Sequence, residues 1–255
     1  MPNLPVRGPE VRLLDLPLPP GRMTLLRNRR PLKRWRYVAV YSPELMLCVG
    51  HARVAGMSQR WWAVALPDGS LFEGARVRGQ IDLAFDEGHG VEVVSPHGRS
   101  YIWTRKQAGI AVRGQVRVAG LTFSVDGPFG FIDESAGYHA RRTSWHWSAG
   151  IGRARDGRAV AWNLVDGVHD SAVDSERTVW IEGSPEEVRP VDFAADLSRV
   201  GELRFTEWSA REDHTNRLLV RSDYRQPFGS FHGVLPGGVE LEQGYGVMEW
   251  HDVRW

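Results

Sequence analysis

The segment Gly137–Gly152 gathers the residue types best suited to acid–base chemistry in this chain. A tyrosine, two histidines, two arginines and two tryptophans follow one another there, GYHARRTSWHWSAGIG, in a run typical of a β-strand. Alternate side chains of a strand point to opposite faces, so Trp145 and Trp147 share one face, and Arg142 and His146 share the other. The polar face either lies in water or, if it is enclosed, must be paired, hydrated or functional.

The next strand-like segment carries a candidate ligand-orienting group, Asn163. Residues 158–165, RAVAWNLV, are apolar on both faces. This pattern predicts a strand covered by a lumen on one side and by another module or the N-terminal segment on the other. A buried Asn must satisfy several hydrogen bonds, so Asn163 either ties a loop or orients a ligand. The turn that follows holds Asp166, His169 and Asp170, a composition suited to general acid–base catalysis but also common in surface turns.

Glu176 and Arg177 stand at the start of another predicted strand. Adjacent strand positions point to opposite faces, so these two side chains need separate partners. We expect Arg177 to form a structural ion pair with Asp166 or Asp170. Glu176 is a candidate proton donor with a raised pKa if it points into a cavity.

The chain closes on a second segment of this kind, in which Glu249 and His251 share one face of a predicted strand. The segment GYGVMEWHDVRW partly copies the central run. If the copy is structural, this face corresponds to the face that carries His146, and the sequence predicts that the three side chains converge.

These patterns define one candidate site. Glu176 or Glu249 is the predicted acid, and His146 or His251 is the predicted base or orienting group. Arg142 and Asn163 are expected to position a polar end of the ligand. The full set comprises the catalytic candidates His146, Glu176, Glu249 and His251 and the ligand-binding candidates Tyr138, Arg142, Trp145, Trp147, Asn163, Asp166, His169 and Arg177.

Several other chemistries have no motif in the sequence. The nine His residues are scattered without HxxxH or HExxH spacing, so we predict no metal site. Neither a G-x-S-x-G elbow nor a glycine-rich phosphate loop is present, and Cys48 lies in an apolar run that indicates buried packing. We therefore expect no metal and no organic cofactor.

The elements that must position these residues are short strands separated by Gly, Pro-Asp-Gly and Ser-Pro turns, which predict an all-β antiparallel barrel or sandwich. Only residues 185–188 and 194–200 suggest helical turns. The proline-rich segment 1–22 predicts an extended strap rather than a helix.

The two halves of the chain repeat one another. The sequence GPFG at 127–130 is matched by QPFG at 226–229, and Gly137-Tyr138 by Gly244-Tyr245. The separation, roughly 100 residues, is the size of one domain. We therefore predict an N-terminal strap and entry strand (1–36) and two tandem antiparallel modules (37–137 and 138–255) that arose by internal duplication.

Segments spread over nearly the whole chain carry a likeness to known proteins. They are Leu18–Thr24, Trp35–Tyr37, Arg142–Trp147, Asn163–Gly167, Ser175–Arg177 and Gly246–Asp252. Together they resemble an uncharacterised bacterial family known only as a domain of unknown function. More distantly, the duplicated layout is similar to tandem lipocalin-like proteins of the carotenoid hydratase (hydroxyneurosporene synthase) type. This resemblance implies lipocalin-like modules and hydrophobic terpenoid or polyketide ligands, handled without an organic cofactor.

Charge and hydropathy limit the partners and the cellular location expected for the protein. A net charge of +1 makes no electrostatic case for nucleic acid as a partner. No apolar run approaches the roughly 18 residues that span a bilayer, and the N-terminus lacks a signal-peptide pattern, so we expect a cytoplasmic protein without an integral membrane segment. Nothing indicates the oligomeric state.

The eleven tryptophans favour broad aromatic walls around an apolar ligand. The leading hypothesis is a protein that encloses a hydrophobic small molecule of isoprenoid, polyketide or fatty-acyl type and performs cofactor-free hydration, cyclisation or isomerisation on it. A non-catalytic carrier of such ligands is the first alternative. A structural or protein-interaction module with a filled core is the second.

Overall fold

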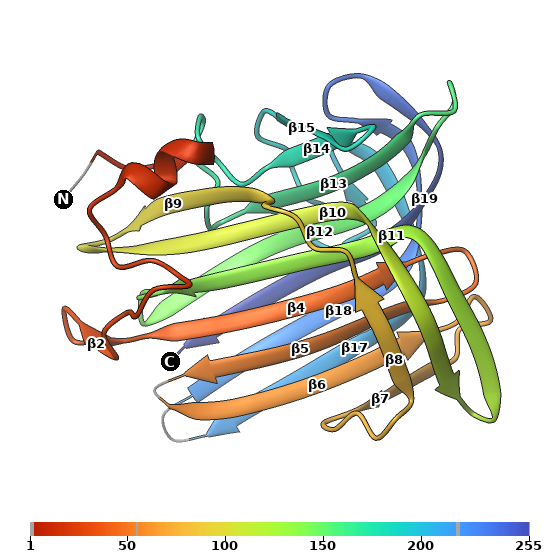
Figure 1. The fold of residues 1–255 in the computed structure, drawn as a ribbon, viewed down its shortest axis with the longest axis horizontal. Coiled ribbons are helices and arrows are strands. Elements are labelled where there is room, and N and C mark those ends of the chain that lie inside the picture. Colours follow the sequence, from red (N-terminus) through yellow and green to blue (C-terminus); the bar gives the residue numbers. More distant parts are fainter. Residues whose placement is uncertain (1–2, 55, 218–219, 255) are drawn as a thin grey trace.

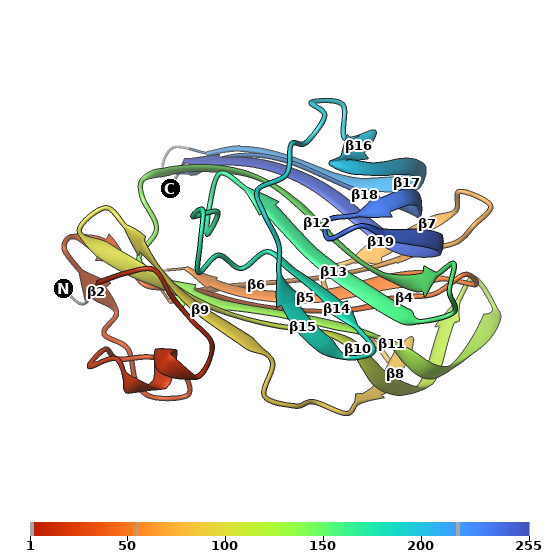
Figure 2. The ribbon, with the colours of Figure 1, turned by 90° about the horizontal axis from the view of Figure 1, so that it is seen from above.

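The structure is a computed structural model that describes residues 3–54, 56–217 and 220–254. Apart from one short helix, its regular elements are β-strands, most of which form two large antiparallel sheets. Figure 1 shows the first sheet in front, and Figure 2 shows the two sheets as stacked layers. The predicted all-β architecture of two tandem antiparallel, lipocalin-like modules is confirmed.

The first sheet is built from the N-terminal half of the chain. In spatial order it comprises β1 (Val6–Arg7), β9 (Val91–His97), β10 (Ser100–Val118), β11 (Leu121–Gly137), β4 (Lys33–Tyr41), β5 (Met46–Val54), β6 (Met57–Ala65) and β7 (Leu71–Gly74), with β8 (Ile81–Phe85) paired to β10. The strands β2 (Leu26–Arg27) and β3 (Arg30–Pro31) form a separate hairpin.

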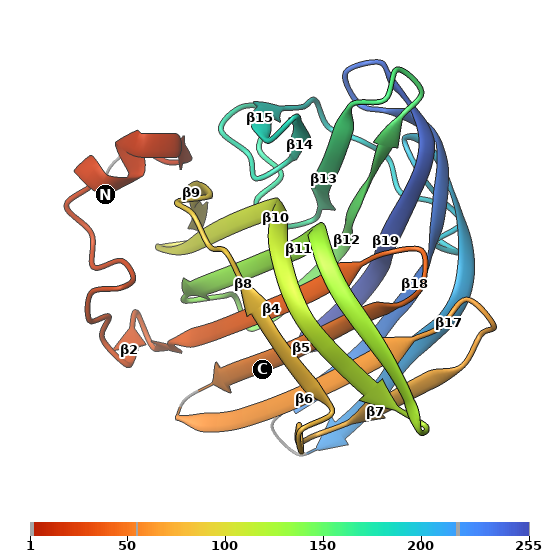
Figure 3. The same ribbon diagram turned by 45° about the vertical axis from the view of Figure 1, so that its right-hand side comes forward.

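The second sheet is built from the C-terminal half. In spatial order it comprises β15 (Ser184–Glu187), β14 (Thr178–Ile181), β13 (Ala159–Asp166), β12 (Arg142–Ala154), β19 (Val239–Arg254), β18 (Val220–Leu235), β17 (Glu202–Arg217) and β16 (Arg199–Val200). Figure 3 shows this sheet curving behind the first.

The two sheets have the same strand order. The path β9-β10-β11-β4-β5-β6-β7 in the first sheet corresponds strand by strand to β17-β18-β19-β12-β13-β14-β15 in the second. In both, the opening strand (β4 or β12) pairs with the closing strand (β11 or β19). The chain passes from one sheet to the other between Gly137 and Arg142.

The buried apolar side chains of the described residues form four clusters, because both faces of each sheet are partly covered. Strand β13 demonstrates this: Ala161 and Val165 point to the cluster between the sheets, whereas Val160, Trp162 and Leu164 point to a second cluster on the other face. The predicted double coverage of residues 158–165 is confirmed. A third cluster packs on the opposite face of the first sheet.

A bulge bends the long β10–β11 hairpin over that third cluster. The register shifts between Ala108 and Ile110, where Gly109 has a φ of +67° that few other residues adopt. Beyond the bulge, β10 pairs with β8, and Val112 and Val116 are buried in the third cluster. The bend thereby closes one end of the first module.

In each sheet, one strand pair places a glycine opposite a tryptophan. Gly50 on β5 faces Trp61 on β6, and Gly150 on β12 faces Trp162 on β13. A Cβ added at either glycine would overlap the indole ring. The missing side chain therefore lets each ring lie flat across the neighbouring strand.

We expect Gly150→Ala to lower the free energy of unfolding by about 1–3 kcal/mol, since overpacking forces the buried Trp162 ring and its strand apart. Urea unfolding followed by tryptophan fluorescence measures this loss. Gly88→Ala is the matched control, because its Cβ would meet only Gln107 Oε1 at an ordinary 3.8 Å. Equal stability of the two variants would contradict the packing argument.

The N-terminal strap lies over the first sheet and is tied to both modules. Val11 and Leu18 pack with Trp103 and other buried side chains of that sheet. The Arg7 guanidinium donates to Ser175 O at 2.5 Å and to Thr178 Oγ1 at 3.0 Å in the second module. The expectation that residues 1–22 contain no helix is wrong, because η1 (Gly8–Leu13) is a 3-10 helix. Proline in its first turn provides a suitable φ there.

The helical turns suggested by the sequence at 185–188 and 194–200 are also absent from the described chain. Ser184–Glu187 is the edge strand β15, where a proline is tolerated because its missing N–H faces outward. Residues 194–198 form a turn before β16. Within the described residues no helix has the length and apolar character needed to cross a bilayer.

Candidate functional site

The central run and the C-terminal segment lie side by side as neighbouring strands β12 and β19. Their register places Trp145 opposite His251 and Trp147 opposite Glu249. Side chains that face each other across an antiparallel pair lie on the same side of the sheet. Glu249 and His251 therefore share the face of the two tryptophans, which is turned toward the first sheet.

His146 projects to the opposite face, so its predicted convergence with Glu249 and His251 does not occur. Its ring stacks on Phe193 with centroids 5.6 Å apart, and its Nδ1 lies 3.8 Å from Asp166 Oδ2. The duplication argument matched the wrong faces, because the register aligns His146 with Trp250 and not with His251.

Glu249 is the centre of the first polar group between the sheets. Trp145 Nε1 donates to its Oε1 at 2.8 Å, and Gln226 Nε2 donates to its Oε2 at 2.7 Å. Both donors are neutral. Burial therefore dominates and raises the pKa of Glu249 to about 7. The carboxyl group can hold or release a proton at neutral pH.

An arginine and a tyrosine complete this group, which we call the Glu249 centre. Arg211 Nη1 lies 3.5 Å from Tyr224 Oη, and its Nε donates to Glu73 Oε2 at 3.2 Å on strand β7 of the first sheet. The guanidinium also lies over the rings of Trp61 and Tyr224. Burial, with the nearby Glu249, holds the pKa of Tyr224 well above its usual value, so the phenol stays protonated.

His251 borders the Glu249 centre as a neutral imidazole. Its ring packs on Trp145 with centroids 4.4 Å apart, and its Nε2 lies 2.8 Å from Ser222 Oγ. Burial lowers the pKa of His251 to about 4. It therefore orients neighbours through hydrogen bonds and carries no charge at pH 7.

A second polar group, the Lys106 centre, joins the two sheets nearby. The Lys106 ammonium lies 2.5 Å from Asp133 Oδ1 and 3.4 Å from Glu176 Oε1. Burial opposes the charge, but the two carboxylates outweigh it and raise the pKa of Lys106. Burial, together with Glu176, also raises the pKa of Asp133. One buried cation thus serves two buried acids.

Asn163 and His169 surround the Lys106 centre. Asn163 accepts from Trp147 Nε1 at 2.8 Å and donates to the carbonyl of Glu176 at 2.9 Å, which ties β12 and β13 to the loop before β14. His169 is buried, and burial followed by Lys106 lowers its pKa to about 3. Neither of its ring nitrogens, nor Glu176 Oε2, has a hydrogen-bond partner among the described residues.

Four predicted residues lie away from both centres. Arg142 is exposed and pairs with Asp252 at 2.8 Å, and the side chain of Asp166 is 55% exposed. Tyr138 donates to the carbonyl of Thr24 at 2.8 Å and so holds the strap. Arg177 donates to the carbonyls of Ser171 and Val188 in place of the expected ion pair with Asp166 or Asp170.

Sequence reasoning missed five residues that matter to these centres, namely Lys106, Asp133, Arg211, Tyr224 and Gln226. A signal for two of them existed. Lys106 and Asp133 are charged residues two positions away from the apolar residues Ala108 and Phe131, which lie on the same face of their strands. A charge on such a face needs a buried partner.

In the part of the chain that the structure describes, no three His, Cys, Asp or Glu side chains gather as metal ligands.

The fold and the two centres define an all-β protein of two lipocalin-like modules with ionisable groups enclosed between them. The sequence of residues 54–255 matches the family described as "Domain of unknown function (DUF2804)". The chain belongs to that family, as the sequence motifs indicated. Among curated protein sequences none matches this chain.

Solved structures similar to this chain include three with long alignments at low identity. A Nitrosomonas europaea protein provisionally called AttH is 14% identical over 91% of this chain and 97% of its own, with a TM-score of 0.47. Kievitone hydratase from Nectria haematococca is 8% identical over 86% and 88% of the two chains, with a TM-score of 0.41. CghA is 12% identical over 98% and 97%, with a TM-score of 0.41.

Proposed function

We propose that the protein binds a hydrophobic small molecule at the seam between its two modules and that Glu249 acts on it as a general acid. The observation that carries the proposal is an enclosed carboxyl group whose pKa, about 7, matches neutral pH. Such a group is the most effective proton donor and acceptor under those conditions.

Access to Glu249 supports the same assignment. Glu249 keeps 8% of its surface exposed, and its neighbours Trp145 and Tyr224 are half-buried. Aromatic faces that border a buried acid suit an apolar ligand with few polar groups, such as an isoprenoid, polyketide or fatty-acyl chain.

The proposed chemistry needs no cofactor. Glu249 transfers its proton to one carbon of a double bond, and the cationic carbon that remains is stabilised by the faces of Trp145 and Tyr224. In hydration, water adds to that carbon and returns a proton to the Glu249 carboxylate. In isomerisation, the neighbouring carbon loses the proton to the same carboxylate. Gln226 holds the carboxyl group in place, and Arg211 binds a polar end of the ligand together with Tyr224.

The Lys106 centre contributes a second set of contacts in this proposal. Buried polar atoms normally have partners, so Glu176 Oε2 and the ring nitrogens of His169 are suited to bind ligand oxygens or water. We also propose that residues 37–137 and 138–255 are modules that arose by duplication, because their sheets share one strand order.

Glu249→Gln tests the proposal. We expect native mass spectrometry to find the same co-purifying ligand on the variant as on the wild type, while turnover of that ligand falls by about 10²–10⁴-fold, the usual contribution of a general acid. Glu240→Gln is the matched control: it makes the same change on the same strand, at a side chain that is 53% exposed and forms a surface pair with Arg155.

Three outcomes would contradict the catalytic role. Undiminished turnover by Glu249→Gln would remove Glu249 as the acid. A bound ligand that the wild type leaves chemically unchanged would identify a carrier. A wild-type protein without any hydrophobic ligand, after exposure to cell extract, would argue for a structural or interaction module.

A further inference from the structure

A separate pocket of about 520 Å³ opens beside the N-terminal strap, away from both centres. Arg12, Pro19 and Pro20 of the strap form one wall. Strands β4, β5, β10 and β11 of the first sheet form the floor. Arginines predominate among its charged residues.

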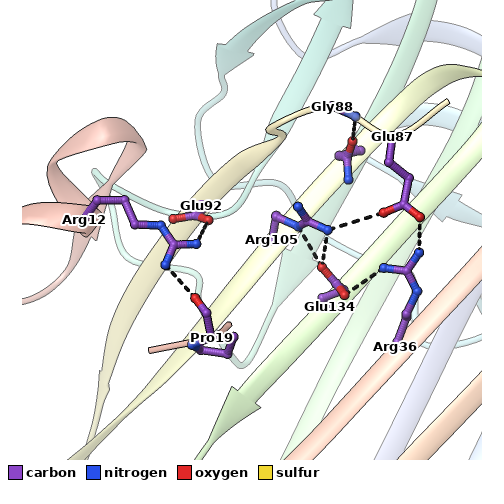
Figure 4. Close-up of polar contacts among 9 residues, drawn as sticks. Arg12, Pro19, Arg36, Glu87, Gly88, Glu92, Arg105 and Glu134 are labelled. Carbon is purple, nitrogen blue, oxygen red and sulfur yellow. Dashed lines mark hydrogen bonds and ion pairs between the residues drawn. The ribbon is translucent and has the colours of Figure 1, made fainter. Parts of the chain in front are cut away.

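Two of these arginines are neutralised by a compact ionic network (Figure 4). Arg36 Nη1 and Arg105 Nε each lie 2.7 Å from an oxygen of Glu134. Glu87 bridges the same two guanidiniums from the other side. Arg12 is likewise paired with Glu92 and donates to Pro19 O at 2.5 Å.

Two other arginines of the pocket lack this compensation. Arg34 and Arg53 lie directly opposite each other on β4 and β5. Across the described residues, neither forms an ion pair or hydrogen bond with an acidic side chain. Like charges directly opposite each other destabilise a sheet. The neighbouring His51 supplies no negative charge to this pair. Burial, together with Arg60 and Arg53, lowers the pKa of His51.

A second pocket adjoins this arginine pair. It has a volume of about 830 Å³ and is also lined by Arg34 and Arg53, with Arg22 as a third arginine. Of its apolar residues Met23 and Leu32 are almost fully buried, whereas Leu25 is exposed. Arg34 and Arg53 therefore line both pockets, close to an exposed apolar side chain, an arrangement complementary to a molecule with a charged end and an apolar chain.

We propose that Arg34 and Arg53 bind the head group of an amphiphilic anion, an apolar chain that ends in a carboxylate or a phosphate, and that its chain lies in the second pocket against Leu25. A guanidinium can donate two parallel hydrogen bonds to either head group. An anion between the two arginines also removes their mutual repulsion. This site is distinct from the seam at Glu249 and holds whether or not Glu249 is catalytic.

Calorimetric titration of the full-length protein with dodecanoate and dodecyl phosphate, below their micellar concentrations, tests the proposal. Wild type should bind at least one of them, and the double variant Arg34→Gln/Arg53→Gln should bind it at least tenfold more weakly. Arg60→Gln is the matched control: this exposed arginine lies on the same face, outside both pockets, and the change should leave affinity unaltered. Neutral dodecanol should bind wild type and double variant equally and weakly.

The thermal unfolding midpoint of the double variant distinguishes loss of the binding site from loss of the fold. Removing two opposed positive charges should leave the midpoint equal or higher, so loss of binding cannot be ascribed to unfolding. Unchanged affinity for dodecanoate and dodecyl phosphate in the double variant would overturn the site, even if both bind elsewhere, such as the seam. Binding to anionic phospholipid vesicles without binding of either monomer would overturn it too, and would assign the surface to a membrane. The head group that binds more tightly distinguishes carboxylate from phosphate.

Discussion

Lys106→Met is expected to lower the free energy of unfolding at pH 7 by about 3–5 kcal/mol. The ammonium group is the cation that serves the buried acids Asp133 and Glu176, at 2.5 and 3.4 Å. Methionine fills a similar volume but leaves two enclosed carboxyl groups without a positive partner. Urea unfolding at pH 7 measures the loss.

A second substitution distinguishes electrostatics from packing. Lys106→Met/Asp133→Asn removes one of the two carboxyl groups left without a cation. It should recover much of the lost free energy of unfolding, because contributions within one ionic network are not additive. Arg158→Met is the surface control. Its pair with Asp156 is solvent-exposed, so we expect the free energy of unfolding to change little. A double variant less stable than Lys106→Met would show that packing around Lys106, and not its charge, holds the two sheets.

Wild-type stability is expected to fall relative to Glu249→Gln as pH rises. The folded-state pKa of Glu249 is about 7 and the ordinary value is 4.5, so the folded protein binds more protons than the unfolded chain between these values. The cost of ionising the buried carboxyl group is therefore absent below about pH 4.5 and complete above about pH 7. Between pH 5 and pH 8 the wild type should lose roughly 2–3 kcal/mol relative to the Gln variant.

The comparison with the variant is what isolates this effect. The pKa values of His251 and His169 are lowered to about 4 and about 3, so both stay neutral in the folded protein and lose stability as pH falls below the ordinary 6.5. Both are present in wild type and variant, and their opposite trend cancels in the difference. Urea unfolding at several pH values measures it. A difference that does not change from pH 5 to pH 8 would place the pKa of Glu249 in the ordinary range.

Much of the architecture could be read from local patterns. Strand alternation and turn residues predicted the antiparallel sheets. The apolar segment 158–165 predicted a strand covered on both faces. These features depend on neighbours within a few residues, and period-two patterns report them directly. At Ser184–Glu187 the local sequence suggested a helical turn, but pairing with the neighbouring strand at the sheet edge makes this segment a strand.

The candidate site was only partly predictable, and the reason is register. Alternation correctly separated Trp145 and Trp147 from His146, but nothing local indicates which β19 residue each of them opposes. A shift of one residue exchanges the faces. The pairing of Trp147 with Glu249 placed the acid beneath the tryptophans and left His146 against Phe193.

By itself, the sequence determined the all-β class and the segments that carry Glu249 and His251, since these follow from residue types and short-range spacing. The tandem arrangement followed from the likeness of segments roughly 100 residues apart. Only the tertiary structure brought Lys106, Asp133 and Glu176 to one point and set Arg34 against Arg53 beneath the strap. Those contacts join strands and loops whose separation along the chain carries no local signal. Burial between the sheets, which shifts the pKa of Glu249 to about 7, exists only once both modules have packed.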